Sequence, residues 1–594
     1  GSRFVPVTCV LRLNRRLQNR RSGSTSTEQE QIRTTLYIRA FRWATDRIGD
    51  AGVVAFVSNG GWIDGNTADG MRLSLADDYS AIYVYNLRGN QRTAGELSRK
   101  EGGKVFGGGS RNTVAVFIGV KDASCTGPCE IFYRDIGDYL SREEKLRIVD
   151  NSNLDLLEWQ TIKPNTHGDW VNQRDDSFST WPVLGDKKKP GAGFFSNYAY
   201  ALLSARDAWV YNFSRRELIK NIKTTIDFYN AEATKFHDLR TAGESVAAKD
   251  VIAYDPVKIS WSSSLIPKLE RGVRIKYSES RVTTAAYRPF CPQALYFDRD
   301  LVHRVGQLPA MFPPGRQGNI GFYTVGTGSD KMFSCMMTAL IPDIAFWGSG
   351  SGQFFPRWTY KRIETRDGEL DFAFVDSTDV DEYGYRRVDN ITDEIHTLYR
   401  NAIGDVTKDD IFYYVYGQLH DPDYRQKYAA DLKKMLPHIP TPQSRDRFDQ
   451  LAAAGRELAD LHVNYEAAEP YPIEVLLKPG VDPNDRETWR VQKMKWRSKT
   501  DHTAIIYNSR VTIEGIPEDA ERYLLGSRSA LGWIVDRYQV TTDKASGIVN
   551  DPNDWCDEHD DPTYIVDLIK KVTTVSVETM KIVASLDSVV GTPP

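Results

Sequence analysis

The chain has 594 residues, of which 41% are hydrophobic and 26% charged, and this length predicts about three or four domains. The composition is that of an ordinary globular protein. No apolar run is long enough to cross a bilayer, which argues against a membrane protein. The net charge of -4 shows that the protein is not a polycation, so nucleic-acid binding would depend on local basic patches.

The six cysteines are too few and too scattered to form a disulfide framework, and they indicate a reducing, cytoplasmic location. Cys125 with Cys129, and Cys556 with His559, would each supply at most half of a metal site. We therefore predict no metal centre.

Residues 1–34 are polar, rich in Arg, Gln and Ser, and lack hydrophobic periodicity. They predict a poorly ordered or non-native leader, and Gly1-Ser2 is typical of a cloning remnant.

Residues 35–189 favour an α/β sheet. Helical spacing begins at Leu36, and the apolar run 52–57 is typical of a parallel strand that is buried on both faces. A helix at 69–75 and strands at 81–86 and 113–120 complete a partial Rossmann-like, doubly wound domain. The loop between these two strands contains Gly107–Gly109, but a strand follows it, whereas a phosphate-binding loop leads into a helix. Because the loop is basic, Arg92 and Arg111 are candidate DNA contacts.

The stretch YIRAFRWATDRIGDAGVVAFVSNGGWIDG, together with NLRGNQRTAGELSRKEGGKVFGGGSRNTVAVFIGVK, resembles the latter half of a γ-class N6-adenine DNA methyltransferase, specifically that of type ISP restriction-modification enzymes. In that family one polypeptide joins a nuclease, a translocase, a methyltransferase and a target recognition domain. The resemblance implies S-adenosylmethionine as the cofactor of the complete enzyme. The glycine turn that binds it and the Asn-Pro-Pro-Tyr motif that holds the flipped adenine do not occur here, so we assign no catalytic or cofactor-binding residue and no cofactor to this chain. A frameshift upstream of residue 36 is one hypothesis for the missing half.

Residues 190–385 are predicted to form a mixed α+β domain for DNA target recognition. Its centre is the stretch from Arg281 to Arg299, which we interpret as two strands around a Pro289–Pro292 bend. Arginines beside aromatic rings suit a nucleic-acid surface, but the same pattern fits a hairpin with core aromatics and solvated arginines. Arg288 in particular is expected to anchor the fold through a carboxylate such as Asp298.

Candidate DNA contacts in this region are drawn from the hairpin, from two glycine-rich loops suited to base reading, and from the RDAWVYN stretch. They are Arg206, Arg281, Arg288, Arg304, Arg316, Gln317, Gln353 and Arg357.

Residues 386–594 predict a mainly helical C-terminal domain, and the family resemblance continues through DRYQVTTDKASGIVNDPNDW. The expected function is recognition of a specific duplex DNA sequence for N6-adenine methylation and, in a complete enzyme, for ATP-driven translocation and cleavage. The expected partners are duplex DNA and the nuclease, translocase and N-terminal methyltransferase portions. The alternatives are a DNA-binding protein without catalysis and an α/β enzyme that does not act on DNA.

Overall fold

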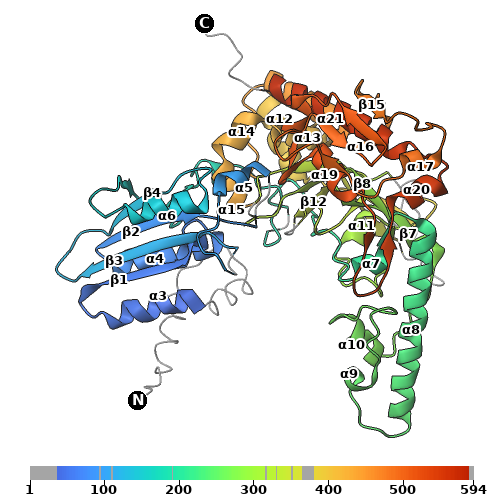
Figure 1. The fold of residues 1–594 in the computed structure, drawn as a ribbon, viewed down its shortest axis with the longest axis horizontal. Coiled ribbons are helices and arrows are strands. Elements are labelled where there is room, and N and C mark those ends of the chain that lie inside the picture. Colours follow the sequence, from blue (N-terminus) through green and yellow to red (C-terminus); the bar gives the residue numbers. More distant parts are fainter. Residues whose placement is uncertain are drawn as a thin grey trace. The chain divides into compact units, whose positions relative to one another are not determined.

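The computed structural model describes residues 36–92, 95–108, 111–189, 191–314, 318–329, 331–348, 352–363 and 380–586. The chain forms two compact units (Figure 1). Unit 1 contains the chain up to Thr180 together with Thr327–Met332 and Tyr428–Leu436. Unit 2 contains Trp181–Gly326, Phe333–Lys427 and the chain from Pro437 onward. Among the described helices, none combines the length and the apolar character that a membrane span requires.

Unit 1 is built on a five-stranded sheet with the order β1-β3-β2-β4-β5. Strand β3 is antiparallel to both β1 and β2, so β1 and β2 run in the same direction, and β2 pairs with β4 in parallel. Side chains from β2 alternate between two small cores, one with α3 and α4 and one with α6. The elements are α3 (Leu36–Arg47), β1 (Ala51–Asn59), α4 (Asp69–Asp78), β2 (Ala81–Arg88), α5 (Gly95–Glu101), β3 (Val114–Asp122), β4 (Glu130–Asp135), α6 (Arg142–Asp150), β5 (Gln160–Ile162) and α15 (Ala429–Lys434).

The prediction that residues 52–57 form a parallel strand buried on both faces is wrong. Within the described part of the chain, β1 is an edge strand, and its one neighbour, β3, is antiparallel. Phe56 stacks on Phe41 of α3, with ring centroids 4.7 Å apart, whereas Val53 and Val57 are 62% and 59% exposed. The run is apolar on both faces, but only one face is covered here. The coarser prediction of a mixed α/β unit is confirmed.

A buried cluster of charges attaches α15 to the rest of unit 1. Lys434 forms ion pairs with Asp64 at 3.2 Å and Asp169 at 3.1 Å, and Arg174 pairs with Asp169 at 2.8 Å. Arg72, fully buried, donates from Nε to the carbonyl of Gly168 at 2.7 Å. Burial opposes ionisation of Asp169, but Arg174 and Lys434 outweigh it and lower the pKa of this carboxyl. The cluster therefore holds ionised groups in the interior because each one is paired.

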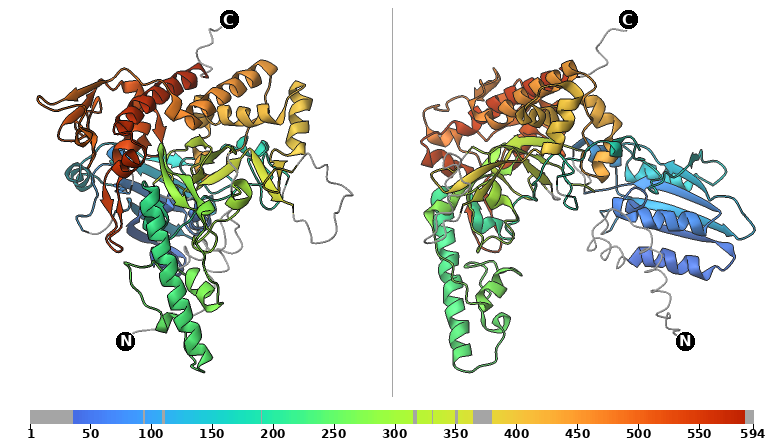
Figure 2. Two further views of the ribbon diagram at one scale, coloured as in Figure 1. Left: turned by 90° about the vertical axis from the view of Figure 1, so that its right-hand side faces the viewer. Right: turned by 180° about the vertical axis from the view of Figure 1, so that it is seen from behind.

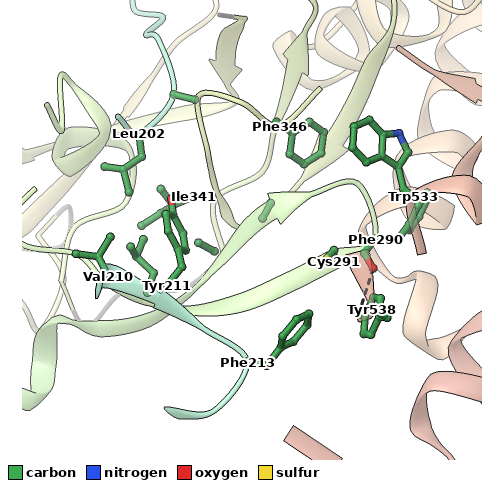
Figure 3. Packing of buried hydrophobic residues seen from close by; sticks show 14 of the residues in the cluster. Leu202, Val210, Tyr211, Phe213, Phe290, Cys291, Ile341, Phe346, Trp533 and Tyr538 are labelled. Carbon is green, nitrogen blue, oxygen red and sulfur yellow. Dashed lines mark hydrogen bonds between the residues drawn. The ribbon is translucent and has the colours of Figure 1, made fainter. Parts of the chain in front are cut away.

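A large hydrophobic core cluster of unit 2 contains buried residues from Ala199 to Val577. Figure 3 shows its centre, where Phe290 and Cys291 at the hairpin turn meet Trp533 and Tyr538 from the C-terminal part of the chain. The Tyr538 hydroxyl donates to the carbonyl of Phe290 at 3.3 Å. Both the predicted recognition domain and the predicted C-terminal domain contribute to this core, and the division between them stays a prediction.

The first half of unit 2 contains two small sheets, with the strand orders β11-β7-β8-β6 and β10-β9-β12, and the two-stranded β13–β14 ribbon. The long helix α8 projects from these sheets as an arm, with α9 and α10 beside it (Figure 2). The elements are α7 (Asp207–Val210), β6 (Tyr211–Asn212), α8 (Arg215–Thr241), α9 (Ala248–Val251), α10 (Leu265–Glu270), β7 (Val282–Arg288), β8 (Cys291–Tyr296), α11 (Leu308–Met311), β9 (Gly321–Thr324), β10 (Cys335–Thr338), β11 (Ile341–Pro342), β12 (Gln353–Pro356), β13 (Trp358–Arg362) and β14 (Tyr385–Asp389).

The second half of unit 2 contains helices together with a four-stranded antiparallel sheet with the order β15-β18-β17-β16. Helices α13 and α16 cross at two glycines: a Cβ on Gly417 would lie 2.1 Å from the Leu451 carbonyl oxygen, and one on Gly455 would lie 1.9 Å from that of Tyr413. The main elements are α12 (Asp393–Ile403), α13 (Lys408–Gln418), α14 (Pro422–Lys427), α16 (Arg445–Val463), β15 (Glu474–Leu477), α17 (Arg486–Trp489), β16 (Lys495–Trp496), β17 (Ala504–Ile506), β18 (Val511–Glu514), α18 (Glu518–Arg522), α19 (Ala530–Arg537), α20 (Pro552–Glu558) and α21 (Tyr564–Ser585), with short hairpins β19–β20 (Leu524–Leu525, Arg528–Ser529) and β21–β22 (Thr541–Thr542, Val549–Asn550).

Candidate nucleic-acid interface

The β7–β8 hairpin is part of the scaffold of unit 2. It turns at Phe290, whose φ of 54° places it in the left-handed region, and both strands lie inside the four-stranded sheet. The guanidinium of Arg288 is buried and donates from Nη1 to the Asp343 carboxylate at 2.7 Å. It also lies 3.9 Å from the centroid of the Tyr287 ring. Arg288 therefore holds the hairpin to the segment that contains Asp343.

Asp298, the expected partner of Arg288, pairs instead with Arg281. The buried carboxylate of Asp298 also accepts hydrogen bonds from the backbone amides of Asp300 and Leu301, each at 2.7 Å. Position along the hairpin explains the difference, because Arg281 precedes β7 and meets the end of β8, whereas Arg288 lies at the opposite end of β7 next to β11. Both arginines are engaged within the fold.

Three further predicted contacts are buried. Arg206 donates to Ser260 and Ser262, and Arg357 forms ion pairs with Asp389 and Asp409. Gln353 in β12 is 9% exposed. Arg92, Arg111 and Arg304 are exposed, the first two in unit 1 and the third in unit 2, while Arg316 and Gln317 lie outside the described residues. The sequence did not distinguish interior arginines from exposed ones, because the carboxylates and serines that bind them are distant in the chain.

One exposed group of lysines and tyrosines was missed by the sequence reasoning. The Nζ of Lys187 lies 4.9 Å from the centroid of the Tyr198 ring and 5.2 Å from that of Tyr200, which is 50% exposed. Ala199 and Phe354 form an antiparallel bridge, and this register places Tyr200 beside Gln353. The Oε1 atom of Gln353 is buried without a hydrogen-bond partner among the described residues. We define the Lys187–Tyr200 patch as Lys187, Lys188, Lys189 and Tyr200, which are exposed; Tyr198 and Gln353 are buried next to them.

The signal for this patch was present in the sequence. Three consecutive lysines at 187–189 precede the alternation Tyr198-Ala199-Tyr200, which puts both tyrosines on one face of an extended segment. Lysines bind phosphate, and an exposed tyrosine supplies a flat apolar surface with a hydroxyl at its end. Neither feature alone identifies a site; their juxtaposition depends on the fold.

The β13–β14 ribbon carries a second basic surface, formed by Lys361, Arg362, Arg386 and Arg387. The register sets Lys361 directly opposite Arg386, although like charges in such positions repel. None of these four side chains forms an ion pair with a carboxylate in the part of the chain that the structure describes. Trp358 fixes the ribbon because the Arg357 and Arg387 guanidinium carbons lie 3.8 and 4.2 Å from its ring centroid.

An open cavity of about 880 Å³ lies in unit 2 next to the β7–β8 hairpin. Two of its arginines are already neutralised, since Arg215 pairs with Glu279 and Arg281 with Asp298. The described residues contain no group of three or more His, Cys, Asp and Glu side chains arranged to hold a metal ion. The exposed basic surfaces, rather than the cavity, therefore have the chemistry of an anion-binding interface.

Comparison with known proteins identifies the region that contains the β13–β14 ribbon and Tyr200, whereas Lys187, Lys188 and Lys189 precede it. Residues 193–568 match the family model described as the Type ISP C-terminal specificity domain. No curated protein matches the chain. Three solved structures are similar along nearly its whole length. The first is a nuclease-deletion mutant of the Type ISP restriction-modification enzyme LlaGI in complex with a DNA substrate mimic, at 36% identity and a TM-score of 0.78 over 97% of this chain.

The second is the ATP-dependent Type ISP restriction-modification enzyme LlaBIII bound to DNA, at 34% identity and a TM-score of 0.80 over 99% of this chain. The third is a DrdV–DNA complex, at 28% identity and a TM-score of 0.74 over 97%. The chain spans 42%, 36% and 54% of those three chains, respectively. Because the family model matches more than half of its residues, the chain belongs to the Type ISP restriction-modification enzymes and carries their C-terminal specificity domain.

Proposed function

We propose that this chain binds duplex DNA and recognises a specific sequence within it, and that it directs N6-adenine methylation to that sequence in a complete enzyme. The observation that carries the proposal is the match of residues 193–568 to a specificity domain whose relatives LlaGI and LlaBIII were solved with DNA or a DNA mimic. The nuclease, translocase and N-terminal methyltransferase portions are the proposed partners, and translocation and cleavage would belong to them.

The β13–β14 ribbon and the Lys187–Tyr200 patch suit different parts of a duplex. Unpaired Lys and Arg side chains on a stiff two-stranded ribbon gain from phosphate contact, which would relieve the repulsion between Lys361 and Arg386. In the patch, the exposed ring of Tyr200 has a flat apolar face that can pack against a base edge such as a thymine methyl, and Lys187 is exposed next to it. The ribbon would position the DNA, and the patch would contribute to reading it.

Unit 1 supports a finer proposal for the fold, namely the latter half of a Rossmann-like methyltransferase sheet. In support, β1 and β2 run in the same direction and helices cover both faces. Within the described ranges, β1 is an edge strand of this sheet. The residues present do not fit a complete S-adenosylmethionine site, because both sequence motifs that would hold the cofactor and the adenine are absent from the 594 residues.

The test is selection of duplexes from a random pool by the full chain, followed by titration of the selected duplex at several salt concentrations. We expect enrichment of one sequence and an affinity that falls steeply with salt. Lys361→Gln combined with Arg386→Gln should lower the salt slope by about two and weaken all duplexes equally. Lys495→Gln with Lys499→Gln, which removes the same charge from the exposed β16 region, is the matched control and should change neither.

Tyr200→Ala should instead relax the preference at one base pair, at a cost of about 1–3 kcal/mol for the selected duplex. Binding of scrambled duplexes should be unchanged. Absence of any salt-dependent affinity at low ionic strength in the unaltered chain would disprove the proposed function as a whole.

A further inference from the structure

Arg206, at the start of α7, is a buried cation without a counter-charge. It is 4% exposed, and its Nε and Nη2 donate to the Ser260 carbonyl at 3.2 Å and to the Ser262 hydroxyl at 2.8 Å. Its Nη1 has no hydrogen-bond partner in the described chain, and no carboxylate forms an ion pair with it there. Burial lowers the pKa of Arg206 to about 10. An uncompensated buried charge destabilises a fold, so this position calls for an anion.

Positive and hydroxyl groups surround the same place. Segment 303–304 pairs with 203–204, since the amide of Arg304 donates to the Leu203 carbonyl at 2.9 Å. His303 Nδ1 lies 2.8 Å from the Ser264 hydroxyl oxygen, two residues beyond the Ser262 hydroxyl that Arg206 contacts. Side-chain hydrogen bonds therefore connect the His303 imidazole, through Ser264 and Ser262, to the buried guanidinium of Arg206.

The surrounding carboxylates do not neutralise Arg206. Asp207 is engaged by the Ser204 hydroxyl, and Asp300 lies 3.6 Å from the Lys268 ammonium. Lys268 itself donates to the carbonyls of Arg299 and Asp300, at 2.6 and 2.8 Å, which fixes its charge beside the cluster. Burial first, and then Arg304, Arg206 and Lys268, lower the pKa of His303, so the imidazole senses a net positive field.

We propose that Arg206, Ser264, His303 and Arg304 form a binding site for a phosphoryl oxyanion at the base of the α8 arm. Exposed Arg304 and half-buried His303 and Ser264 would contact the anion, and Arg206 would act beneath them as a fixed positive charge. The ligand chemistry is a phosphate oxygen pair. A backbone phosphodiester of DNA is the source favoured here, which rests on the proposed function, and free inorganic phosphate is the other.

The first experiment follows the imidazole of His303 by NMR in the full chain, with labelled histidine and with His303→Gln for assignment. Its pKa is measured in sodium phosphate and in sodium chloride at equal ionic strength. We expect phosphate to raise the pKa of His303 toward its ordinary value, because a bound anion offsets the three nearby cations. In Arg304→Ala the difference between the two buffers should disappear. Arg240→Ala, at the far end of α8, removes an exposed arginine as the matched control.

The second experiment measures the affinity of the chain for the selected duplex by titration. Arg304→Ala should weaken it about tenfold and reduce the salt slope by about one, with Arg240→Ala unchanged. A response of His303 to phosphate with unaltered duplex affinity would support the anion site and overturn DNA as its source. No response to phosphate would overturn the site even if Arg304→Ala weakened DNA binding. If the unaltered chain bound no DNA, the proposed function would fail, and the first experiment would still show whether the anion site exists.

Discussion

Replacing Arg288 by methionine tests whether the β7–β8 hairpin depends on a buried ion pair. The substitution keeps the apolar length of the side chain but leaves the carboxylate of Asp343, 1% exposed, without its cation at 2.7 Å. Removing one partner of a buried pair costs about 3–5 kcal/mol, because the remaining charge is neither hydrated nor neutralised. Some of this cost is avoidable, since Asp343 still accepts hydrogen bonds from the Ala345 amide at 2.9 Å and the Tyr211 hydroxyl at 3.2 Å.

The cost depends on pH in a direction that the structure determines. Burial raises the pKa of Asp343 to about 6 despite Arg288. Between the ordinary pKa of an aspartate and about 6, the folded state therefore binds more protons than the unfolded state. Protonation of Asp343 stabilises the folded state at the lower end of this range, and that stabilisation is lost as the pH rises through it. Without Arg288 the pKa rises further, and the carboxyl takes up a proton more cheaply at low pH. Each pH unit is worth about 1.4 kcal/mol, so Arg288→Met should destabilise the hairpin less at pH 6 than at pH 8, by at most about 2–3 kcal/mol.

Hydrogen exchange read by mass spectrometry measures this locally, with peptides covering β7–β8 as the reporter and peptides from β2–β3 of unit 1 as the internal standard. Adding Asp343→Asn to Arg288→Met should recover part of the loss, because no charge is then stranded. Arg299→Ala, an exposed arginine just after β8, is the control and should have no effect. Unchanged protection of β7–β8 in Arg288→Met, together with lost sequence preference for DNA, would show that Arg288 reads a base and that the anchoring argument is wrong.

Three other outcomes are expected. Burial lowers the pKa of His462 to about 3, so below the ordinary histidine pKa of about 6.5 the folded state binds fewer protons than the unfolded state. Unit 2 should therefore lose stability as the pH falls from about 6.5 toward 3. Denaturant midpoints at pH 7.5 and 5 measure this loss, and His462→Gln should make it smaller. Gly455→Ala should destabilise the α13–α16 crossing, because the added Cβ would lie 1.9 Å from the Tyr413 carbonyl oxygen. Alanine is more favourable than glycine in a helix by about 1 kcal/mol, which should not offset this clash; a raised melting temperature would contradict the prediction. Lys434→Met should cost about 1–3 kcal/mol, because Asp169 loses one of the cations that offset its burial while Arg174 stays paired with it; an unchanged melting temperature would count against the buried cluster.

The sequence predicted elements more successfully than their surroundings. Periodicity located α3, α4, β2 and β3 within a few residues, because local spacing of apolar residues decides whether a segment is a helix or a strand. It failed at residues 52–57, where the apolar run is the same whether one face or both faces are covered. Helical spacing after Ser214 likewise predicts a helix that ends at Tyr229, whereas α8 continues to Thr241. The family resemblance supplied the function that no single motif carried.

The candidate site was harder to predict because exposure depends on partners far away in the chain. Arg357 and Arg387 are both close to Trp358, yet the first is buried by Asp389 and Asp409 and the second is exposed. Nothing local distinguishes them. Likewise, Arg206 resembles any arginine before a short helix until the turn at 260–264 folds over it. Long-range pairing, rather than residue type, separates contact residues from scaffold.

The membership of α15 in unit 1 limits how specificity could be exchanged between related enzymes. Residues 428–436 lie between two long stretches of unit 2, but Lys434 is bound by Asp64 and Asp169 from the first third of the chain. A recombination event with a single junction near residue 180 would import a foreign α15 along with the new recognition region. Such a chimera would keep its stability only if the donor also carried a cation where Lys434 stands. Evolutionary shuffling, or grafting in the laboratory, therefore requires either a matched charge at this position or additional junctions that leave the native α15 in place.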